Sequence, residues 1–399
     1  MPTALLLENV HPVAEQVLRA SGWDVRTARG AMDGRELSEA LRDVDVLGIR
    51  SKTQVSADVL AAAPHLVAVG AFCIGTNQID VGAASTNGTA VFNAPFSNTR
   101  SVVELALAEI IALTRRLTQK DRALHEGVWD KSADGAHEVR GRTLGIVGYG
   151  NIGSQLSVVA EALGMRVLFY DTADKLALGN ARRCASVDDL LEEADVVSLH
   201  VDGRAGNAGL FGEAQLRRMK QGAIFLNLSR GFVVDHEALR DRVVSGHLGG
   251  VAVDVFPDEP KRQGDEFASI LRGLPNVILT PHIGGSTEEA QEHIGLFVAG
   301  KLRDYVTTGS TMLSINLPTL DLPYAPSQHR IAHLHRNVPG VLARVNGVLA
   351  DHGVNVEGQL LGTSGELGYV LTDMNLDAAP DVATELGRLP ETVRLRVLS

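Results

Sequence analysis

The sequence predicts an α/β protein of three parts, and three observations lead to this prediction. Short apolar runs alternate with helical patterns up to about residue 306, which is typical of parallel sheets covered by helices. One of these runs ends in a glycine-rich turn, Gly148-x-Gly150-x-x-Gly153. From residue 329 on, the pattern changes to strand, helix, strand, strand, helix, strand.

The first part, residues 1–98, has the pattern of a small flavodoxin-like unit. Its apolar runs predict strands, and the amphipathic segments between them predict helices. The strands are expected at 4–7, 44–49, 66–71 and 91–93, and the helices at 12–21 and 34–41. Regular alternation of this kind favours a parallel sheet with helices on both faces.

The glycine-rich turn predicts a Rossmann unit that binds a dinucleotide. Gly148 suits the tight turn, Gly150 leaves room for a pyrophosphate, and Gly153 lets the helix pack closely on the strand. Asn151 and Ile152 open that helix, whose free N–H groups face the phosphates. The same turn also occurs in strand–helix units that bind no nucleotide.

Asp171 favours NAD as the dinucleotide. It ends the next expected strand, 166–170, where a carboxylate is placed to bind the ribose hydroxyls. An acid there repels a 2′-phosphate, and no Arg follows it directly. NAD is therefore expected rather than NADP.

Two long helical patterns, 101–117 and 286–306, bracket this unit. Thr99 or Ser101 is expected to cap the first helix and Ser286 the second. The arrangement indicates that one domain is inserted into another. We expect a substrate domain at 1–98 and 286–315, with an NAD domain at 99–285.

The proline-containing stretch 316–328 is expected to be a linker. The βαββαβ order of residues 329–399 predicts a ferredoxin-like module. It carries no visible nucleophile or acid pair, so a regulatory or oligomerising role is expected.

Composition excludes several classes of function. A net charge of −11 argues against a nucleic-acid or acidic-membrane partner. No apolar run is long enough for a membrane span, and the first residues do not resemble a signal peptide. Cys73 and Cys184 cannot form a disulfide framework, so a cytoplasmic location is expected. The histidines show no metal-ligand spacing, and no metal is implied.

Four residues after expected strand ends are candidates for chemistry. Arg230 can fork onto a substrate carboxylate, and His282 can exchange the proton of a hydroxyl. Glu259 can hold the imidazole, although Asp258 next to it is a competing candidate. Asp254 either bonds the nicotinamide amide or caps a loop. Each residue alone has an ordinary structural alternative, which their joint occurrence after a dinucleotide motif disfavours.

Two further groups of residues, each with at least one cation, are candidates for binding an anionic part of the substrate. Arg50, Ser51 and Lys52 follow the expected strand 46–49, and a solvated basic pair is the alternative. Trp129 and Lys131, in a polar loop, are weaker candidates of the same kind.

Six stretches together resemble the D-isomer-specific 2-hydroxyacid dehydrogenases, in the form that carries a C-terminal ACT domain. They are 72–78, 91–102, 148–153, 229–231, 254–260 and 280–287. The resemblance covers nearly the whole chain. It implies NAD-linked oxidation of 3-phospho-D-glycerate to 3-phosphooxypyruvate, the entry step of serine biosynthesis, and also reduction of 2-oxoglutarate. Another activity of the family, reduction of glyoxylate or hydroxypyruvate, is the alternative. A scaffold that binds NAD without catalysis is a third possibility, which the intact candidate set disfavours.

The resemblance also assigns roles to residues. It implies that His282 is the acid/base, Glu259 its partner and Arg230 the group that holds the substrate carboxylate. It places Arg50, Ser51, Lys52 and Lys131 at the substrate. The implied NAD contacts are Gly148, Gly150, Asn151, Ile152, Gly153, Asp171, Leu228, Ser229, Arg230, Asp254, His282, Gly284 and Gly285.

For the ACT module, the resemblance implies serine as a feedback effector bound across a dimer interface. His335, Asn337 and Asn355 match the effector positions. The implied assembly is a homotetramer held by nucleotide-domain and ACT-domain contacts. Three departures from the family pattern stand out. Lys52 replaces a second Arg, Val338 replaces the Arg of close relatives, and Asp202 stands where a Pro usually follows the strand ending at His200.

Overall fold

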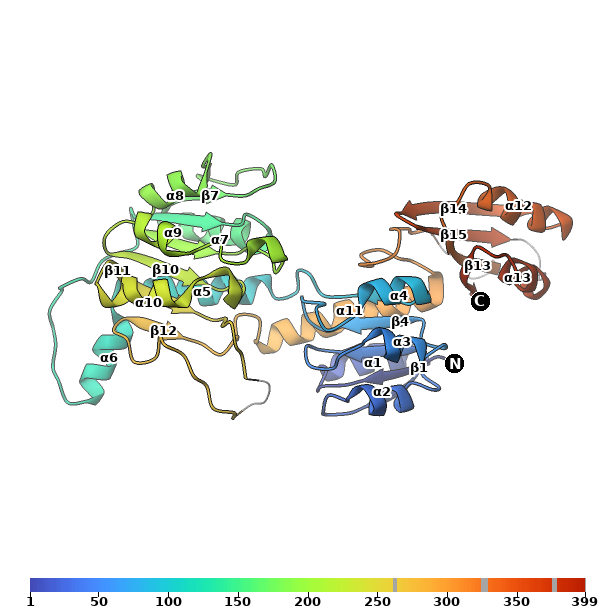
Figure 1. Cartoon of the computed structure of the whole chain (residues 1–399), viewed down its shortest axis with the longest axis horizontal. Coiled ribbons are helices and arrows are strands. Elements are labelled where there is room, and N and C mark those ends of the chain that lie inside the picture. The colour runs from blue at the N-terminus through green and yellow to red at the C-terminus, as the bar shows by residue number, and fades with distance from the viewer. Residues whose placement is uncertain (261–263, 324–328, 375–378, 399) are drawn as a thin grey trace. The chain divides into compact units, whose positions relative to one another are not determined.

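The computed structural model describes residues 1–260, 264–323, 329–374 and 379–398. The chain forms two compact units, Met1–Ser97 with Gln291–Ser399 and, between them, Asn98–Ala290 (Figure 1). The ACT region therefore clusters with the first part of the chain. The finer domain boundaries expected from sequence stay predictions.

A five-stranded parallel sheet forms the centre of the first unit. Its order β2-β1-β3-β4-β5 is the flavodoxin-like order, as predicted. The strands are β1 (Thr3–Leu6), β2 (Asp24–Thr27), β3 (Val46–Ile49), β4 (Ala68–Ala71) and β5 (Ala90–Phe92). Strand β2 was not predicted, because only Val25 in it is buried and it therefore shows no apolar run.

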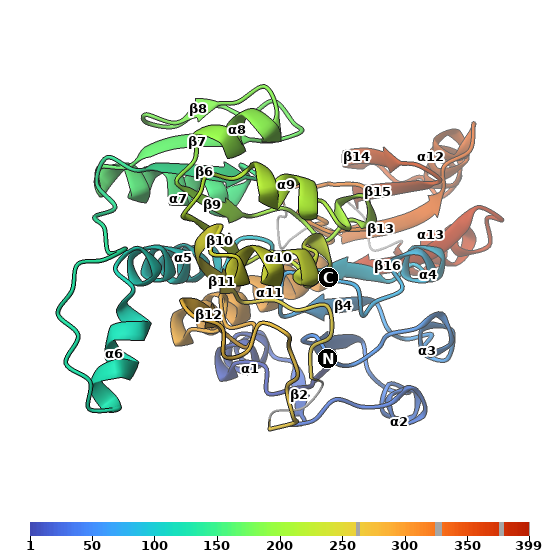
Figure 2. The same cartoon turned by 60° about the vertical axis from the view of Figure 1, so that its left-hand side comes forward.

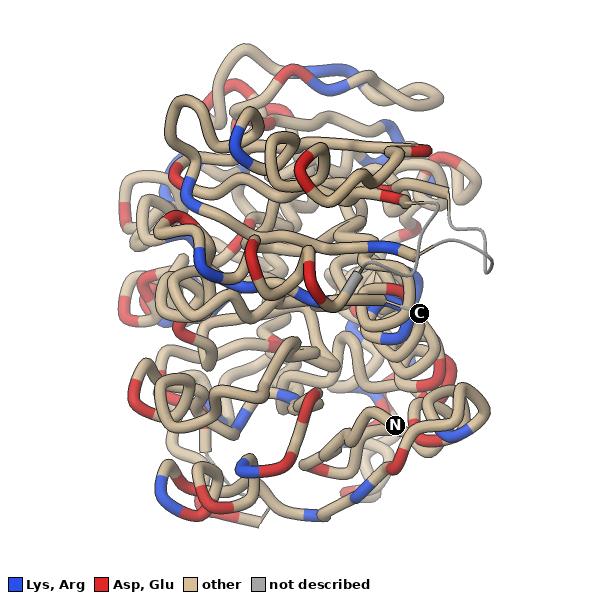
Figure 3. The backbone as a smooth tube through the Cα atoms, turned by 90° about the vertical axis from the view of Figure 1, so that its right-hand side faces the viewer, with Lys and Arg blue, Asp and Glu red and all other residues tan. Residues whose placement is uncertain are grey.

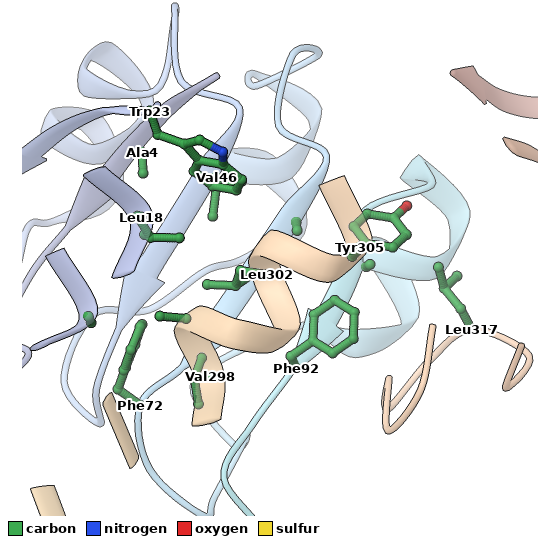
Figure 4. Close-up of a cluster of buried hydrophobic side chains, with 14 of the residues drawn as sticks. Ala4, Leu18, Trp23, Val46, Phe72, Phe92, Val298, Leu302, Tyr305 and Leu317 are labelled. Carbon is green, nitrogen blue, oxygen red and sulfur yellow. The ribbon is translucent and has the colours of Figure 1, made fainter. Parts of the chain in front are cut away.

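Helices cover both faces of this sheet. On one face lie α1 (Pro12–Ala20) and α11 (Glu288–Thr308). On the other lie α2 (Gly34–Ala40), α3 (Ala57–Ala61) and α4 (Val81–Asn87). Figure 4 shows Val298, Leu302 and Tyr305 of α11 beside Phe72 and Phe92. The segment after the nucleotide unit thus completes the core of the first sheet.

The second unit is built on a seven-stranded parallel sheet of order β12-β11-β10-β9-β6-β7-β8. Counted from β6, this is the Rossmann order 3-2-1-4-5-6 with one further strand at an edge. The strands are β6 (Thr143–Val147), β7 (Arg166–Tyr170), β8 (Arg182–Arg183), β9 (Val196–Leu199), β10 (Ala223–Asn227), β11 (Leu248–Val253) and β12 (Val277–Leu279).

Helices α5 (Thr99–Thr114) and α7 (Asn151–Ala162) pack on one face of this sheet. The other face is covered by α8 (Val187–Glu193), α9 (Glu213–Arg218) and α10 (His236–Val244) (Figure 2). Two 3-10 helices, Ala205–Asn207 and Gly231–Val233, lie in the connections.

The helix expected at 101–117 differs in the structure. It ends at Thr114, and a separate helix α6 (Leu117–His125) follows after Arg116, whose φ of 52° is left-handed. No residue of α6 is buried, so its sequence has no apolar stripe from which a separate helix could be predicted. The expected caps were also wrong. Asn98 precedes α5 without a side-chain cap bond, and Thr287 rather than Ser286 accepts the N–H of Ala290 at 3.2 Å.

The C-terminal module has the predicted ferredoxin-like order. It comprises β13 (His329–Arg336), α12 (Val341–Asp351), β14 (Val356–Ser364), β15 (Leu367–Met374), α13 (Ala379–Gly387) and β16 (Thr392–Leu398). Its antiparallel sheet runs β14-β15-β13-β16. Part of the expected linker, 324–328, lies outside the described residues.

One face of this sheet packs on α12 and α13, and the other joins the core of the first unit through Leu334, Tyr369 and Leu398. The fully buried Arg330 links the C-terminal sheet to the segment that precedes it. It pairs with Asp373 at 2.6 Å and donates to the carbonyls of Thr308, Leu322 and Pro323.

Acidic and basic residues are interspersed along the chain (Figure 3). None of the described helices is both long and apolar enough to span a membrane.

Candidate active site

The carboxyl ends of three neighbouring strands bring the predicted catalytic residues to one edge of the nucleotide-unit sheet. Arg230 follows β10, Asp254 follows β11 and His282 follows β12. Ligands of open parallel sheets bind at this edge. Glu259 reaches the same place from the loop after β11.

His282 and Glu259 form an ion pair. The imidazole Nδ1 lies 2.8 Å from Glu259 Oε2 and 3.1 Å from Oε1. The Phe256 N–H also donates to Oε1, at 3.1 Å. Because Nδ1 is engaged, Nε2 is the ring nitrogen available to a ligand. The sequence left Asp258 as a rival to Glu259, and the geometry selects Glu259.

The pair shifts both titrations toward the charged forms. The hydrogen bond to Glu259 raises the pKa of His282 above its ordinary value, although burial opposes this. Burial alone would raise the pKa of Glu259, but the bonds from His282 and the Phe256 N–H bring it below its ordinary value. Glu259 thus stabilises the imidazolium, so that His282 can take up a proton as well as release one.

Asp254 organises the loop that carries His282. Its carboxylate accepts the Thr280 hydroxyl at 2.6 Å and the N–H groups of Ile283 and Gly284 at 2.8 and 2.9 Å. Its carbonyl accepts the His282 N–H at 2.8 Å, and His282 has a left-handed φ of 55°. Of the two roles considered for Asp254, the structure shows the loop cap.

Arg230 is held by a compact turn after β10. The Asn227 amide donates to the Arg230 carbonyl at 3.0 Å, and Asn227 Oδ1 accepts both the N–H and the hydroxyl of Ser229. Gly231 next to it lies against the Phe256 backbone, where a Cβ would come within 2.0 Å. Leu228 and Ser229 are buried. These contacts fix the backbone from which the Arg230 side chain projects.

The glycine-rich turn has the geometry that a dinucleotide needs. Gly148 has a φ of 94°, and a Cβ on Gly153 would lie 2.2 Å from the Gly148 carbonyl. At Gly150 nothing lies within 4 Å of where a Cβ would point. Asn151 and Ile152 open α7 before its first intrahelical bond, from Ser154 to Gly150. Tight packing on one side and open space on the other fit a pyrophosphate.

Asp171 lies directly after β7, as expected for a ribose-binding carboxylate. It is oriented by two backbone donors, Tyr149 N–H at 2.7 Å and Ala173 N–H at 2.8 Å. The residues present therefore fit NAD.

The cations expected at the substrate are divided between the two units. Arg50, Ser51 and Lys52 follow β3 in the first unit, and Lys131 is an exposed residue of the second. Sequence reasoning missed the residue that shapes the first loop. Buried Glu8 accepts the N–H groups of Ser51, Lys52 and Thr53 at 2.8–3.1 Å. Its left-handed φ of 62° was not visible as a pattern.

Glu109 of α5 is a second missed residue. It is 3% exposed, and neither carboxylate oxygen has a hydrogen-bond partner among the described residues. Burial, with a smaller effect of the Asp254 charge, raises the pKa of Glu109 to about 8. The surroundings of Glu109 therefore favour its protonated form. From the sequence, Glu109 is a single acidic residue in a mostly apolar helix, and no motif marks it as a candidate.

The predicted effector residues do not meet within one chain. His335 and Asn337 lie at the end of β13, where His335 pairs with Gly368 of β15 and Gly368 pairs with Thr363 of β14. Asn355 precedes the start of β14, at the opposite end of the sheet. His335 is buried, whereas both asparagines are exposed.

Among the described residues, no group of three or more His, Cys, Asp or Glu side chains is arranged to hold a metal ion.

Comparisons with known proteins agree with this geometry. Residues 107–284 match the NAD-binding domain of D-isomer-specific 2-hydroxyacid dehydrogenases, and residues 331–394 match an ACT domain like that of the AHAS small subunit. A D-lactate dehydrogenase from Aquifex aeolicus, solved with NAD and lactic acid, superposes with a TM-score of 0.68. It is 25% identical and covers 79% of this chain and all of that one.

The chain belongs to the D-isomer-specific 2-hydroxyacid dehydrogenase family, and it is an NAD-dependent oxidoreductase. Its full-length relatives include D-3-phosphoglycerate dehydrogenases. The Haemophilus influenzae enzyme is 49% identical, covering 99% of this chain and 96% of its own. The Escherichia coli enzyme is 48% identical, covering 99% and 97%.

Proposed function

We propose that the protein is a D-3-phosphoglycerate dehydrogenase, which oxidises 3-phospho-D-glycerate to 3-phosphooxypyruvate as the first step of L-serine biosynthesis. The observation that carries this proposal is the full-length relationship to enzymes of that name. The His282–Glu259 pair supports it, because oxidation of a hydroxyl requires a proton acceptor at the reacting carbon.

In this mechanism His282 Nε2 takes the proton of the substrate C2 hydroxyl. Glu259 stabilises the imidazolium that results and holds the ring through Nδ1. Arg230 forks onto the substrate carboxylate and orients C2. When bound, NAD supplies the hydride acceptor. In the reverse direction His282 returns the proton to the carbonyl oxygen.

The substrate phosphate is bound by the cationic loop of Arg50, Ser51 and Lys52, with Lys131 as a further cation. Glu8 supports this role. Its carboxylate accepts the backbone N–H groups of Ser51, Lys52 and Thr53 and so holds the loop in one conformation. Lys52 in place of a second Arg keeps the charge but not the bidentate geometry.

The residues predicted for NAD would hold it at the same edge of the sheet. Gly148, Gly150 and the start of α7 would bind the pyrophosphate, and Asp171 would bind the adenosine ribose. Leu228, Ser229, Asp254, Gly284 and Gly285 would bind the nicotinamide end, and Asp254 also keeps the His282 loop in place.

Serine acts as feedback inhibitor at the ACT module, through His335, Asn337 and Asn355. Because these residues lie at opposite ends of one sheet, two modules must pair to complete a site. Strand β14 is an edge strand with Val356, Leu360 and Leu361 partly exposed, which suits such pairing. The enzyme is a cytoplasmic homotetramer with a second contact through the nucleotide domains.

The test is the rate of NADH formation from 3-phospho-D-glycerate, with hydrazine present to trap the product. Activity that serine suppresses is expected. Activity without any serine response would contradict the regulatory role of the ACT module. No activity, with rapid NADH oxidation by glyoxylate, hydroxypyruvate or 2-oxoglutarate, would show that the substrate is another 2-hydroxy acid.

A further inference from the structure

A cavity of about 300 Å³ lies at the amino ends of β10, β11 and β12 in the nucleotide unit. Arg230, Asp254 and His282 lie at the carboxyl ends of the same strands. The cavity is therefore at the opposite edge of the sheet from the active-site residues, and the proposed reaction makes no use of it.

The polar lining of this cavity is cationic. Arg116, His137 and Arg142 line it, and no Asp or Glu is among its described lining residues. This is unusual in a chain with a net charge of −11. Arg142 donates through Nε to the Glu138 carbonyl at 3.1 Å, which leaves its terminal nitrogens without a bond to a described residue. Arg116 is bonded to Gln119 and, at 3.4 Å, to the Asp134 carbonyl.

The Asp195 carboxylate, which lies near Arg142, already has other partners. Asp195 accepts the Thr143 N–H at 2.8 Å and the Lys220 ammonium at 3.0 Å. Burial raises the pKa of Asp195, the bonds from Thr143 and Lys220 bring it below its ordinary value, and the Arg142 charge has the smallest effect. Asp195 therefore does not neutralise Arg142, and its positive charge remains available to a ligand.

Two buried polar atoms in the wall are also unsatisfied among the described residues. They are Thr114 Oγ1 and Asn276 Oδ1, in side chains that are 2% and 5% exposed. The Asn276 amide nitrogen donates to the carbonyls of Leu113 and Gly249, so the amide orientation is determined and Oδ1 is left over. Such atoms are uncommon in native proteins and indicate a missing partner.

We propose that this cavity binds the phosphate group of a small molecule, either inorganic phosphate or a small phosphate ester. Two guanidinium groups and an imidazole suit a tetrahedral dianion, to which guanidinium can donate paired hydrogen bonds. Leu113 and Leu248 supply an apolar wall for the organic part of an ester. Thr114 and Asn276 are neutral polar residues of the lining.

The test is isothermal titration calorimetry of the full-length protein with inorganic phosphate at constant ionic strength. Saturating NAD occupies the pyrophosphate site, and an Arg50→Gln background removes the phosphate contact proposed for the substrate. One phosphate is expected to bind per subunit. Adding Arg142→Gln should raise the Kd about tenfold, as the loss of a charge-assisted hydrogen bond implies.

Arg115→Gln is the matched control, because Arg115 is an exposed neighbour that does not line the cavity. It should leave the Kd within about twofold. Arg116→Gln serves as the second variant if Arg142→Gln does not fold. A parallel titration with propyl phosphate separates the sources: tighter binding identifies an ester ligand, and equal binding identifies inorganic phosphate. No binding in the Arg50→Gln background, or binding that survives both cavity substitutions, would overturn the proposal.

Discussion

At the scale of single residues, the acid/base role proposed for His282 depends on Glu259, a residue 23 positions earlier in the chain. Glu259 fixes which ring nitrogen faces a ligand and raises the pKa of the imidazole. Asp254 fixes the backbone from which the ring projects. None of the three residues would define an acid/base site alone.

Replacing His282 with Gln should remove the proton acceptor and leave the nucleotide turn intact. We expect kcat to fall by about 10²–10⁴-fold with little change in NAD affinity. Steady-state rates and an NAD titration by fluorescence measure the two effects. His293→Gln, at an exposed position of α11, is the control and should behave as wild type. Surviving turnover in His282→Gln would show that another group accepts the proton.

Replacing Glu259 with Gln should shift the pH dependence of the reaction. Glu259 raises the pKa of His282, so its removal lowers that pKa. Oxidation requires neutral His282 and rises with pH through this pKa, so its acid limb should move to lower pH. Reduction requires the imidazolium, so its alkaline limb should also move to lower pH. Profiles of kcat/KM in both directions measure these shifts, and unmoved limbs would exclude His282 as the titrating group.

At the scale of elements, the candidate binding residues follow the ends of strands. The loops that carry them are stabilised by hydrogen bonds to residues distant in sequence. The glycines of the nucleotide turn show this division clearly. Gly153 is required by packing within the protein, whereas Gly150 faces open space. The same motif thus serves two separate physical needs.

Gly153→Ala and Gly150→Ala should therefore differ. The Cβ that Gly153→Ala adds would overlap the Gly148 carbonyl, and we expect a loss of about 1–3 kcal/mol in stability. Gly150→Ala should keep the wild-type Tm and weaken only NAD binding. Thermal unfolding without NAD and an NAD titration test both variants. Equal Tm losses would show that the open space at Gly150 is not left for a ligand.

Glu8→Gln should loosen the cationic loop. A carboxylate that accepts three N–H groups is replaced by an amide that can accept fewer, at a cost of about 1–3 kcal/mol. We expect a raised KM for 3-phospho-D-glycerate and an unchanged NAD affinity. Asp33→Asn controls for general destabilisation, because Asp33 caps α2 through the N–H groups of Arg35 and Glu36. An unchanged KM would separate the loop from substrate binding.

At the scale of the whole molecule, the chain carries half of the predicted effector site at each end of one sheet. His335 and Asn337 lie beside Gly368, and Asn355 lies beside the pairing of Val356 with Met374. A single chain cannot bring them together. Regulation by serine, if it uses these residues, requires assembly.

Mixed oligomers test this requirement. Asn337→Ala and Asn355→Ala should each abolish the serine response of NADH formation, since every paired site then lacks one group. Oligomers that contain both variants should regain part of the response, because some sites combine two intact halves. The reference is wild-type protein expressed from two gene copies in the same way as the two variants. A mixture as insensitive as its parents would show that each site is built within one chain.

Much of the fold follows from local pattern. The turn at 148–153, the carboxylate of Asp171 and the succession of helices and strands along the C-terminal module all depend on residues close in sequence. Elements without an apolar pattern were missed, as β2 and α6 show. Their formation depends on edge pairing or on the left-handed Arg116.

The sequence by itself determined the class of fold, the cofactor and the residue types at the strand ends, because period, glycine placement and charge are local properties. Only the tertiary structure decided that Glu259 rather than Asp258 meets His282, that Asp254 caps its loop, and that Glu8 holds the cationic loop. It also revealed the cationic cavity, whose residues come from positions 113 to 276. Contacts of this kind depend on how distant segments pack, which no short stretch of sequence encodes.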